Sequence, residues 1–142
     1  MRERSPQTMA GYSARSLVDK LGIKAGHKLC ILNAPSGYDK TLGPLPPGAT
    51  RLSKLSANLD FIHFFTKSKS DLEKALPGMR ASLVANGMIW VSWPKGASKV
   101  ATDLNENIVR ELALKNKLVD VKVAAVDDVW SGLKLVIRVK DR

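Results

Sequence analysis

Aromatic and basic side chains follow one another in "VSWPKGASKVATD", the segment at residues 91–103. Lys95 and Lys99 come shortly before an expected helix whose N-terminus we predict Asp103 to cap. Two ammonium groups beside the positive end of a helix dipole favour a bound anion. A second interpretation stays open, in which Trp93 closes the end of the core and the two lysines are solvated.

Residue types that commonly carry out catalysis are sparse in the rest of the chain. His27 lies in a predicted turn and His63 in a predicted strand, and neither has a second His or Cys at metal-ligand spacing. Asp127 and Asp128 are expected to be turn residues. There is no phosphate-binding P-loop and no nucleophile elbow. We therefore expect no catalytic residue and no metal site, and a binding module rather than an enzyme.

Three short apolar runs bounded by turn-forming residues predict strands that are buried on both faces. They are "LCILNAP" from residue 29, "LDFIHFF" from residue 59 and "MIWVSW" from residue 88. Cys30, the sole cysteine, lies in the first run and is expected in the core. The Gly- and Pro-rich segment after this run should be mostly loop, with one turn of helix and an edge strand around Arg51.

Helical spacing appears before the first of these runs and after the second and third. Ser13 is the expected cap of the first helix, and Ser70 is the expected cap of the second, which Gly87 should end. Pro77 falls inside the second helix, which should kink or divide there. The third helix follows Asp103.

Buried strands that alternate with helices predict an α/β protein with a three-layer, Rossmann-like fold. Its sheet should be mostly parallel, and alternation of apolar and polar residues over 119–123 and 133–139 predicts a C-terminal antiparallel hairpin. We expect one domain over residues 11–142, after a disordered tail at residues 1–10. No apolar stretch approaches the roughly 18 residues of a membrane span, so we expect a cytoplasmic protein without a membrane partner.

Ligands of open parallel sheets bind beyond the carboxyl ends of the strands. This rule selects residues that follow the three strands, together with the tryptophan of the hairpin link. Lysines would supply charge and aromatic rings would stack. The candidate ligand contacts are Asn33, Ser36, Gly37, Tyr38, Lys67, Trp93, Lys95, Ser98, Lys99 and Trp130.

The formal net charge of +10 and the pI near 10.0 favour anionic partners. Our leading hypothesis is an anionic small molecule or an acidic protein partner. Nucleic-acid binding is an alternative, and a solvated basic surface without a specific partner is another. Homodimerisation through the edge of the hairpin is a further hypothesis.

Two family resemblances add to these expectations. The order of "HKLCILNAP", "LDFIHFF", "LVANG", "MIWVSW", a helix and a final hairpin resembles the latter part of a class I S-adenosylmethionine-dependent methyltransferase. The glycine-rich cofactor loop of that family reads "NAPSGY" here, with Gly37 as its one glycine. No acidic residue ends a clear second strand to hold ribose hydroxyls, and one strand–helix unit is missing between Tyr38 and Asn58.

The second resemblance, to the bacterial domain of unknown function 3052, rests on "LNAPSGY", "LGPLPPG", "VSWPK" and "VATDLNENIVRE". That family has no assigned function, so this resemblance adds no expectation about an activity. Together the resemblances imply a truncated, non-catalytic methyltransferase-like domain for which we expect no cofactor. The alternative is an active methyltransferase that keeps S-adenosylmethionine in a modified pocket.

Overall fold

A six-stranded sheet in the order β2-β1-β3-β4-β6-β5 runs through the centre of the molecule. The computed structural model describes residues 16–142, so the predicted tail and the predicted cap Ser13 lie outside the described residues. The strands are β1 (Lys28–Leu32), β2 (Thr50–Leu52), β3 (Leu59–Phe65), β4 (Leu83–Pro94), β5 (Leu118–Ala125) and β6 (Trp130–Ile137).

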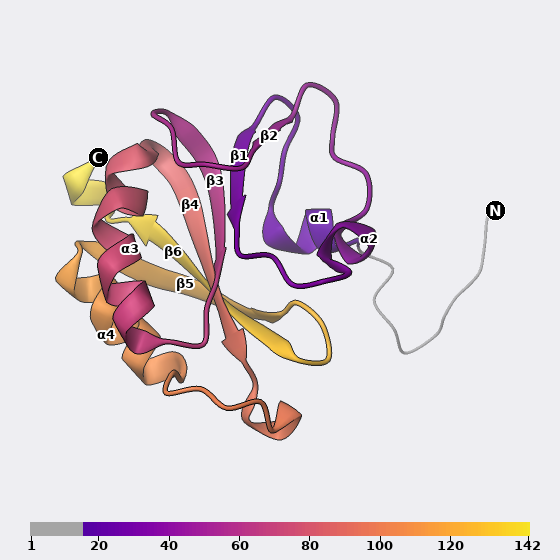
Figure 1. Cartoon of the computed structure of the whole chain (residues 1–142). Coiled ribbons are helices and arrows are strands. Elements are labelled where there is room, and N and C mark those ends of the chain that lie inside the picture. The colour runs from indigo at the N-terminus through magenta and orange to yellow at the C-terminus, as the bar shows by residue number, and fades with distance from the viewer. Residues whose placement is uncertain (1–15) are drawn as a thin grey trace.

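The first four strands are parallel, whereas β6 runs antiparallel to β4 and β5 antiparallel to β6. The carboxyl ends of the parallel strands therefore share one edge of the sheet, the lower edge in Figure 1. The strands β1, β3 and β4 are central and carry the three predicted apolar runs, since both of their faces are covered. The predicted three-layer fold with a terminal antiparallel hairpin is confirmed.

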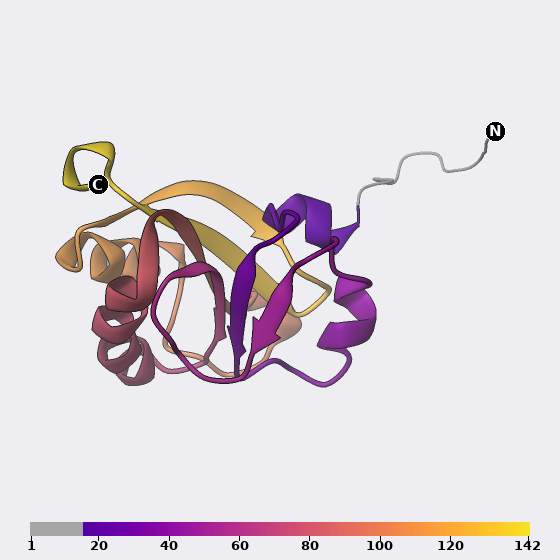
Figure 2. The same cartoon turned by 90° about the horizontal axis from the view of Figure 1, so that it is seen from above.

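Two short helices, α1 (Leu17–Leu21) and α2 (Tyr38–Leu42), cover one face of the sheet, and two longer helices, α3 (Lys69–Ser82) and α4 (Glu106–Lys115), cover the other (Figure 2). Short 3-10 turns, η1 (Gly96–Ser98) and η2 (Val139–Asp141), follow β4 and β6. The helical turn and edge strand expected in the Gly- and Pro-rich segment are present as α2 and β2.

The caps of the two longer helices differ from the predictions. Ser68, and not Ser70, caps α3, because its hydroxyl accepts from the backbone N of Asp71 at 3.2 Å. Asn105, and not Asp103, caps α4 by accepting from the backbone N of Ile108 at 2.9 Å. Asp103 instead accepts from the backbone N of Lys69 at 2.7 Å, at the start of α3.

Helix α3 also ends differently from the prediction. It runs through the exposed Pro77 without dividing, because solvent can satisfy the carbonyl that a proline leaves without an amide donor. Gly87 does not end the helix but lies within β4, which begins at Leu83. A Cβ at Gly87 would lie 2.8 Å from the Leu83 side chain and 3.1 Å from the Asp60 carbonyl, so any other residue would force Leu83 and the neighbouring strand to shift.

The core has two parts, one on each face of the sheet. The part between the sheet and α3 and α4 contains Trp93, whose exposed fraction is 5%, and Cys30. The part under α1 and α2 contains Trp90, whose indole Nε1 donates to the Leu21 carbonyl at 2.8 Å and so fixes α1 on the sheet. None of the described helices has the length and apolar character that crossing a bilayer requires.

Candidate ligand site at the carboxyl edge of the sheet

The loop after β1 reaches the shared edge, with Asn33, Ser36 and Gly37 exposed. Asn33 adopts a left-handed conformation (φ 59°), and its side-chain Nδ2 donates to the Phe65 carbonyl at the end of β3, at 3.3 Å. Gly37 precedes α2 with φ 87°, a conformation that glycine adopts without steric cost. The loop is thus tied to the neighbouring strand and presents these three predicted residues at the edge.

Tyr38 follows this loop but points into the protein. Its exposed fraction is 3%, and its hydroxyl lies 2.9 Å from the Nδ1 atom of His63. The Nε2 atom of His63 lies 2.8 Å from the Ser92 hydroxyl, and both of these residues are fully buried. Tyr38, His63 and Ser92 therefore form a buried polar network that links α2, β3 and β4.

Burial sets the protonation of this network. It lowers the pKa of His63 to about 3, since a charged imidazolium would lose its hydration. Burial also raises the pKa of Tyr38 well above its ordinary value; Arg51 lowers that pKa and Asp39 raises it, with smaller effects. At neutral pH the network is therefore uncharged.

The aromatic side chains near the edge pack on one another. His63 stacks on Phe65 with ring centroids 4.1 Å apart, and Trp130 meets Phe65 edge-on at 5.2 Å. Trp130 reaches the edge because it pairs with Pro94, at the end of β4. Its position is held by Asp127, whose carboxylate accepts from the Trp130 backbone N at 2.7 Å. Trp130 is half-buried, whereas the rings of Tyr38 and Trp93 are not exposed to a ligand in this structure.

The predicted lysines lie at the same edge, on loops fixed by their backbones. Lys67 and Lys99 are exposed and Lys95 is half-buried. The Lys67 carbonyl accepts from the Thr102 hydroxyl at 2.7 Å, and the Lys95 carbonyl accepts from the hydroxyl of the half-buried Ser98 at 2.6 Å. None of the three ammonium groups forms an ion pair with another described residue.

A hollow of about 290 Å³ opens beside the ends of β1 and β2, lined by Ile31, Arg51, Leu52 and Ser53. The Arg51 guanidinium lies 5.9 Å from the centroid of the Tyr38 ring, and its Nη1 donates to the Asp39 carboxylate at 2.6 Å. Sequence reasoning placed Arg51 on an edge strand but missed it as a site residue. The signal available was the place of Arg51 on that predicted edge strand, since ligands of open parallel sheets bind near the strand ends.

Metal chemistry has no support in the described part of the chain, where no three His, Cys, Asp or Glu side chains are grouped to hold an ion.

Solved structures resemble this fold over most of the chain. A SAM-dependent methyltransferase from Aquifex aeolicus matches with a TM-score of 0.58 and 14% identity, over 86% of this chain and 88% of that one. Magnesium protoporphyrin IX methyltransferase from Synechocystis, with bound SAH, matches with a TM-score of 0.56 and 10% identity, over 86% and 78%. The fold is that of a class I methyltransferase.

Fibrillarin from Aeropyrum pernix, with natively bound S-adenosyl-L-methionine, also shares this methyltransferase fold, with a TM-score of 0.56, 13% identity and coverage of 82% and 69%. No family model and no curated protein sequence matches the chain. The resemblance to domain of unknown function 3052 therefore stays a prediction. The low identities leave the methyltransferase likeness as one of fold.

Proposed function

We propose that this methyltransferase-fold domain binds a small anionic ligand in the hollow beside β1 and β2 and does not transfer methyl groups. The observation that carries this proposal is the Arg51 guanidinium, which lines the hollow at the edge where ligands of open parallel sheets bind. A cation in this position favours a phosphate or carboxylate group.

The geometry around Arg51 supports recognition of such a group. Asp39 and the Tyr38 ring hold the guanidinium from two sides, which reduces the side-chain entropy that a ligand would have to remove. The bond to Asp39 uses one of five guanidinium N–H donors, so a fork of donors remains for a ligand. Lys67 and Lys95, at the same edge, would add positive charge.

The size and lining of the hollow favour a compact ligand over S-adenosylmethionine. At about 290 Å³ it lies at the lower limit of small-molecule pockets, which begin at about 300 Å³. After β2 the chain continues with Ser53 and Lys54, so no carboxylate follows this strand to accept ribose hydroxyls. A phosphorylated metabolite of small size matches the volume and the charge.

The proposal can be tested by thermal melting and titration calorimetry with inorganic phosphate, pyrophosphate, AMP and S-adenosylhomocysteine. We expect at least one phosphate-containing probe to raise the melting temperature. Arg51→Gln should then lower the affinity for that probe at least about tenfold, because the substitution removes a charge-assisted hydrogen bond.

Lys74→Gln, on the exposed surface of α3, is the matched control and should leave the affinity unchanged. The proposal fails if no phosphate-containing probe stabilises the protein, or if Arg51→Gln binds the stabilising probe as tightly as the wild type does.

A second candidate function is S-adenosylmethionine-dependent methyl transfer, favoured by the neighbours that hold S-adenosylmethionine or S-adenosylhomocysteine. Under this alternative S-adenosylhomocysteine would stabilise wild type and Arg51→Gln equally, and the exposed loop at 33–37 would be the contact. Gly37→Val should then abolish the stabilisation by placing a branched side chain at a left-handed position of that loop.

A further inference from the structure

Four lysines gather on the sheet face that carries α1, over β5 and β6 and away from the Arg51 hollow. Lys134 on β6 lies opposite Lys122 on β5 in the sheet register. The Lys134 ammonium lies 4.0 Å from where a Cβ on Gly22 would stand, at the end of α1. Lys24 follows that glycine, and the Lys20 ammonium donates to the Ala125 carbonyl at 3.3 Å. We call Lys20, Lys24, Lys122 and Lys134 the lysine face.

No described residue forms an ion pair with the lysine face. Asp120, the acidic residue of β5, bonds the Arg110 side chain of α4 at 3.0 Å, on the opposite face of the sheet. Lys134 forms no ion pair within residues 16–142. Its pKa is lowered by burial and then by Lys122 and Lys24, so the three ammonium groups repel one another. Like charges opposite each other on neighbouring strands destabilise a sheet unless an anion lies between them.

We propose that the lysine face binds nucleic acid through the phosphodiester backbone, without regard to base sequence. Lys122 is exposed and Lys134 half-buried, so the charges lie on an open surface that a polyanion can follow. Lysine is a point charge suited to phosphates, and the four residues include no arginine or aromatic ring that would read or stack bases. The net charge of +10 would steer a polyanion toward the protein.

The test is the salt dependence of binding to a labelled DNA duplex of mixed sequence, measured by fluorescence anisotropy with the full chain. In the variant Lys24→Gln/Lys122→Gln/Lys134→Gln, the slope of log K against log salt should become shallower by about 2.7, since each phosphate contact contributes about 0.9. Between about 50 and about 200 mM salt, wild type should lose about 40-fold more affinity than this variant. Lys20 is kept because it bonds the Ala125 carbonyl.

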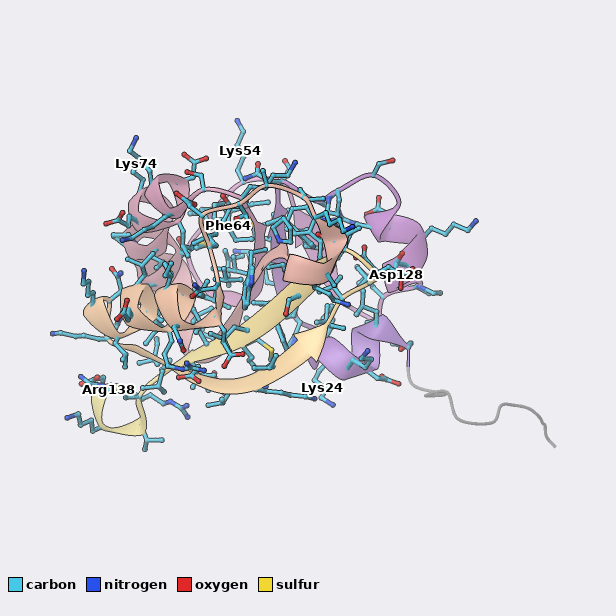
Figure 3. All side chains as sticks on the ribbon, turned by 90° about the horizontal axis from the view of Figure 1, so that it is seen from below. Lys24, Lys54, Phe64, Lys74, Asp128 and Arg138 are labelled. Carbon is cyan, nitrogen blue, oxygen red and sulfur yellow. The ribbon has the colours of Figure 1, made fainter. Side chains whose placement is uncertain are left out.

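The matched control is Lys54→Gln/Lys74→Gln/Lys140→Gln, which removes the same charge from exposed positions elsewhere. Figure 3 shows Lys54 and Lys74 on the opposite side of the molecule from Lys24. The control should keep the wild-type slope, and thermal melting of both variants checks that they fold. The proposal is overturned if both variants change the slope equally, if wild type does not bind the duplex, or if phosphatidylserine vesicles bind more tightly with the same dependence on the three lysines.

Discussion

His63 is an ionisable side chain in the interior whose two ring nitrogens both meet hydroxyl groups, those of Tyr38 and Ser92. A neutral imidazole has one donor and one acceptor nitrogen, and a hydroxyl can complement either. All three polar groups are therefore satisfied without charge. This arrangement makes the stability of the protein sensitive to acid, because His63 can bind a proton in the unfolded chain but stays neutral in the folded protein.

The unfolding free energy should fall as the pH drops below about 6.5. In the unfolded chain the pKa of His63 returns to its ordinary 6.5, whereas it is about 3 in the folded protein. Between these values the unfolded state alone is protonated, and each pH unit should cost about 1.4 kcal/mol of stability. Above about pH 6.5 this contribution is constant.

His63→Gln, which cannot titrate, separates this effect from other groups. Urea unfolding at about pH 7 and about pH 5.5 should show a loss of stability that is smaller in the variant by about 1.4 kcal/mol. An equal loss in both proteins would contradict the assignment.

At this scale the sequence predicted that His63 is structural, but not what it bonds. Tyr38 was expected at the ligand edge because it follows β1, and it does lie at that end of the sheet. Its ring instead turns inward and meets the rings of His63 and Phe65 edge-on, and these contacts belong to the tertiary packing and not to the local pattern.

The N-terminus of α3 forms hydrogen bonds with a segment that is distant in sequence. Ser68 satisfies one amide of the first turn, and Asp103, from the segment before α4, satisfies the amide of Lys69. The Lys67 carbonyl also accepts from the Thr102 hydroxyl, so the two segments are joined in both directions. The start of α3 therefore depends on the chain that enters α4.

Asp103→Ala should destabilise the protein by about 1 kcal/mol, as removal of a helix-terminal acceptor typically does. Amide hydrogen exchange should become faster in the first turn of α3 rather than at the start of α4. Glu73→Ala, on the exposed surface of α3, is the control and should change stability by less than about 0.5 kcal/mol. Faster exchange confined to α4 would support the cap that the sequence suggests.

The sequence predicted which strands and helices form, but not the residues at which the helices begin and end. Continuous apolar runs predicted β1, β3 and β4 correctly, because burial on both faces leaves a strong local signal. Ser68 and Ser70 are equally good caps by type, and so are Asp103 and Asn105. The choice between such neighbours depends on where the other layer of the molecule lies.

At the scale of the whole molecule, β5 forms one edge of the sheet. Two of its apolar side chains are exposed, Val121 by 55% and Val123 by 49%. Lys122 lies between them, and charged side chains on an edge strand oppose pairing with a second sheet. The carboxyl edge was predictable at this scale from strand order alone. The Arg51 hollow was not, because it needs the short β2, which follows a Gly- and Pro-rich segment, to lie beside β1.

Lys122→Val should increase self-association, because it makes the exposed edge continuously apolar from Val121 to Val123. Light scattering on warming should show aggregation at a lower temperature than for wild type. Lys74→Val on α3 removes the same charge away from the edge and should have a smaller effect. Equal aggregation of the two variants would assign the change to net charge.

The loop from Asn33 to Tyr38 is anchored at both ends, by the Asn33 amide on Phe65 and by the Tyr38 hydroxyl on His63. A loop held in this way has already lost most of its conformational entropy when the chain folds. A ligand at this edge would therefore meet a surface that needs little ordering, and more of its contact energy would appear as affinity. Loosening either anchor should weaken the binding of a ligand that contacts this loop, because the ligand would then have to order the loop.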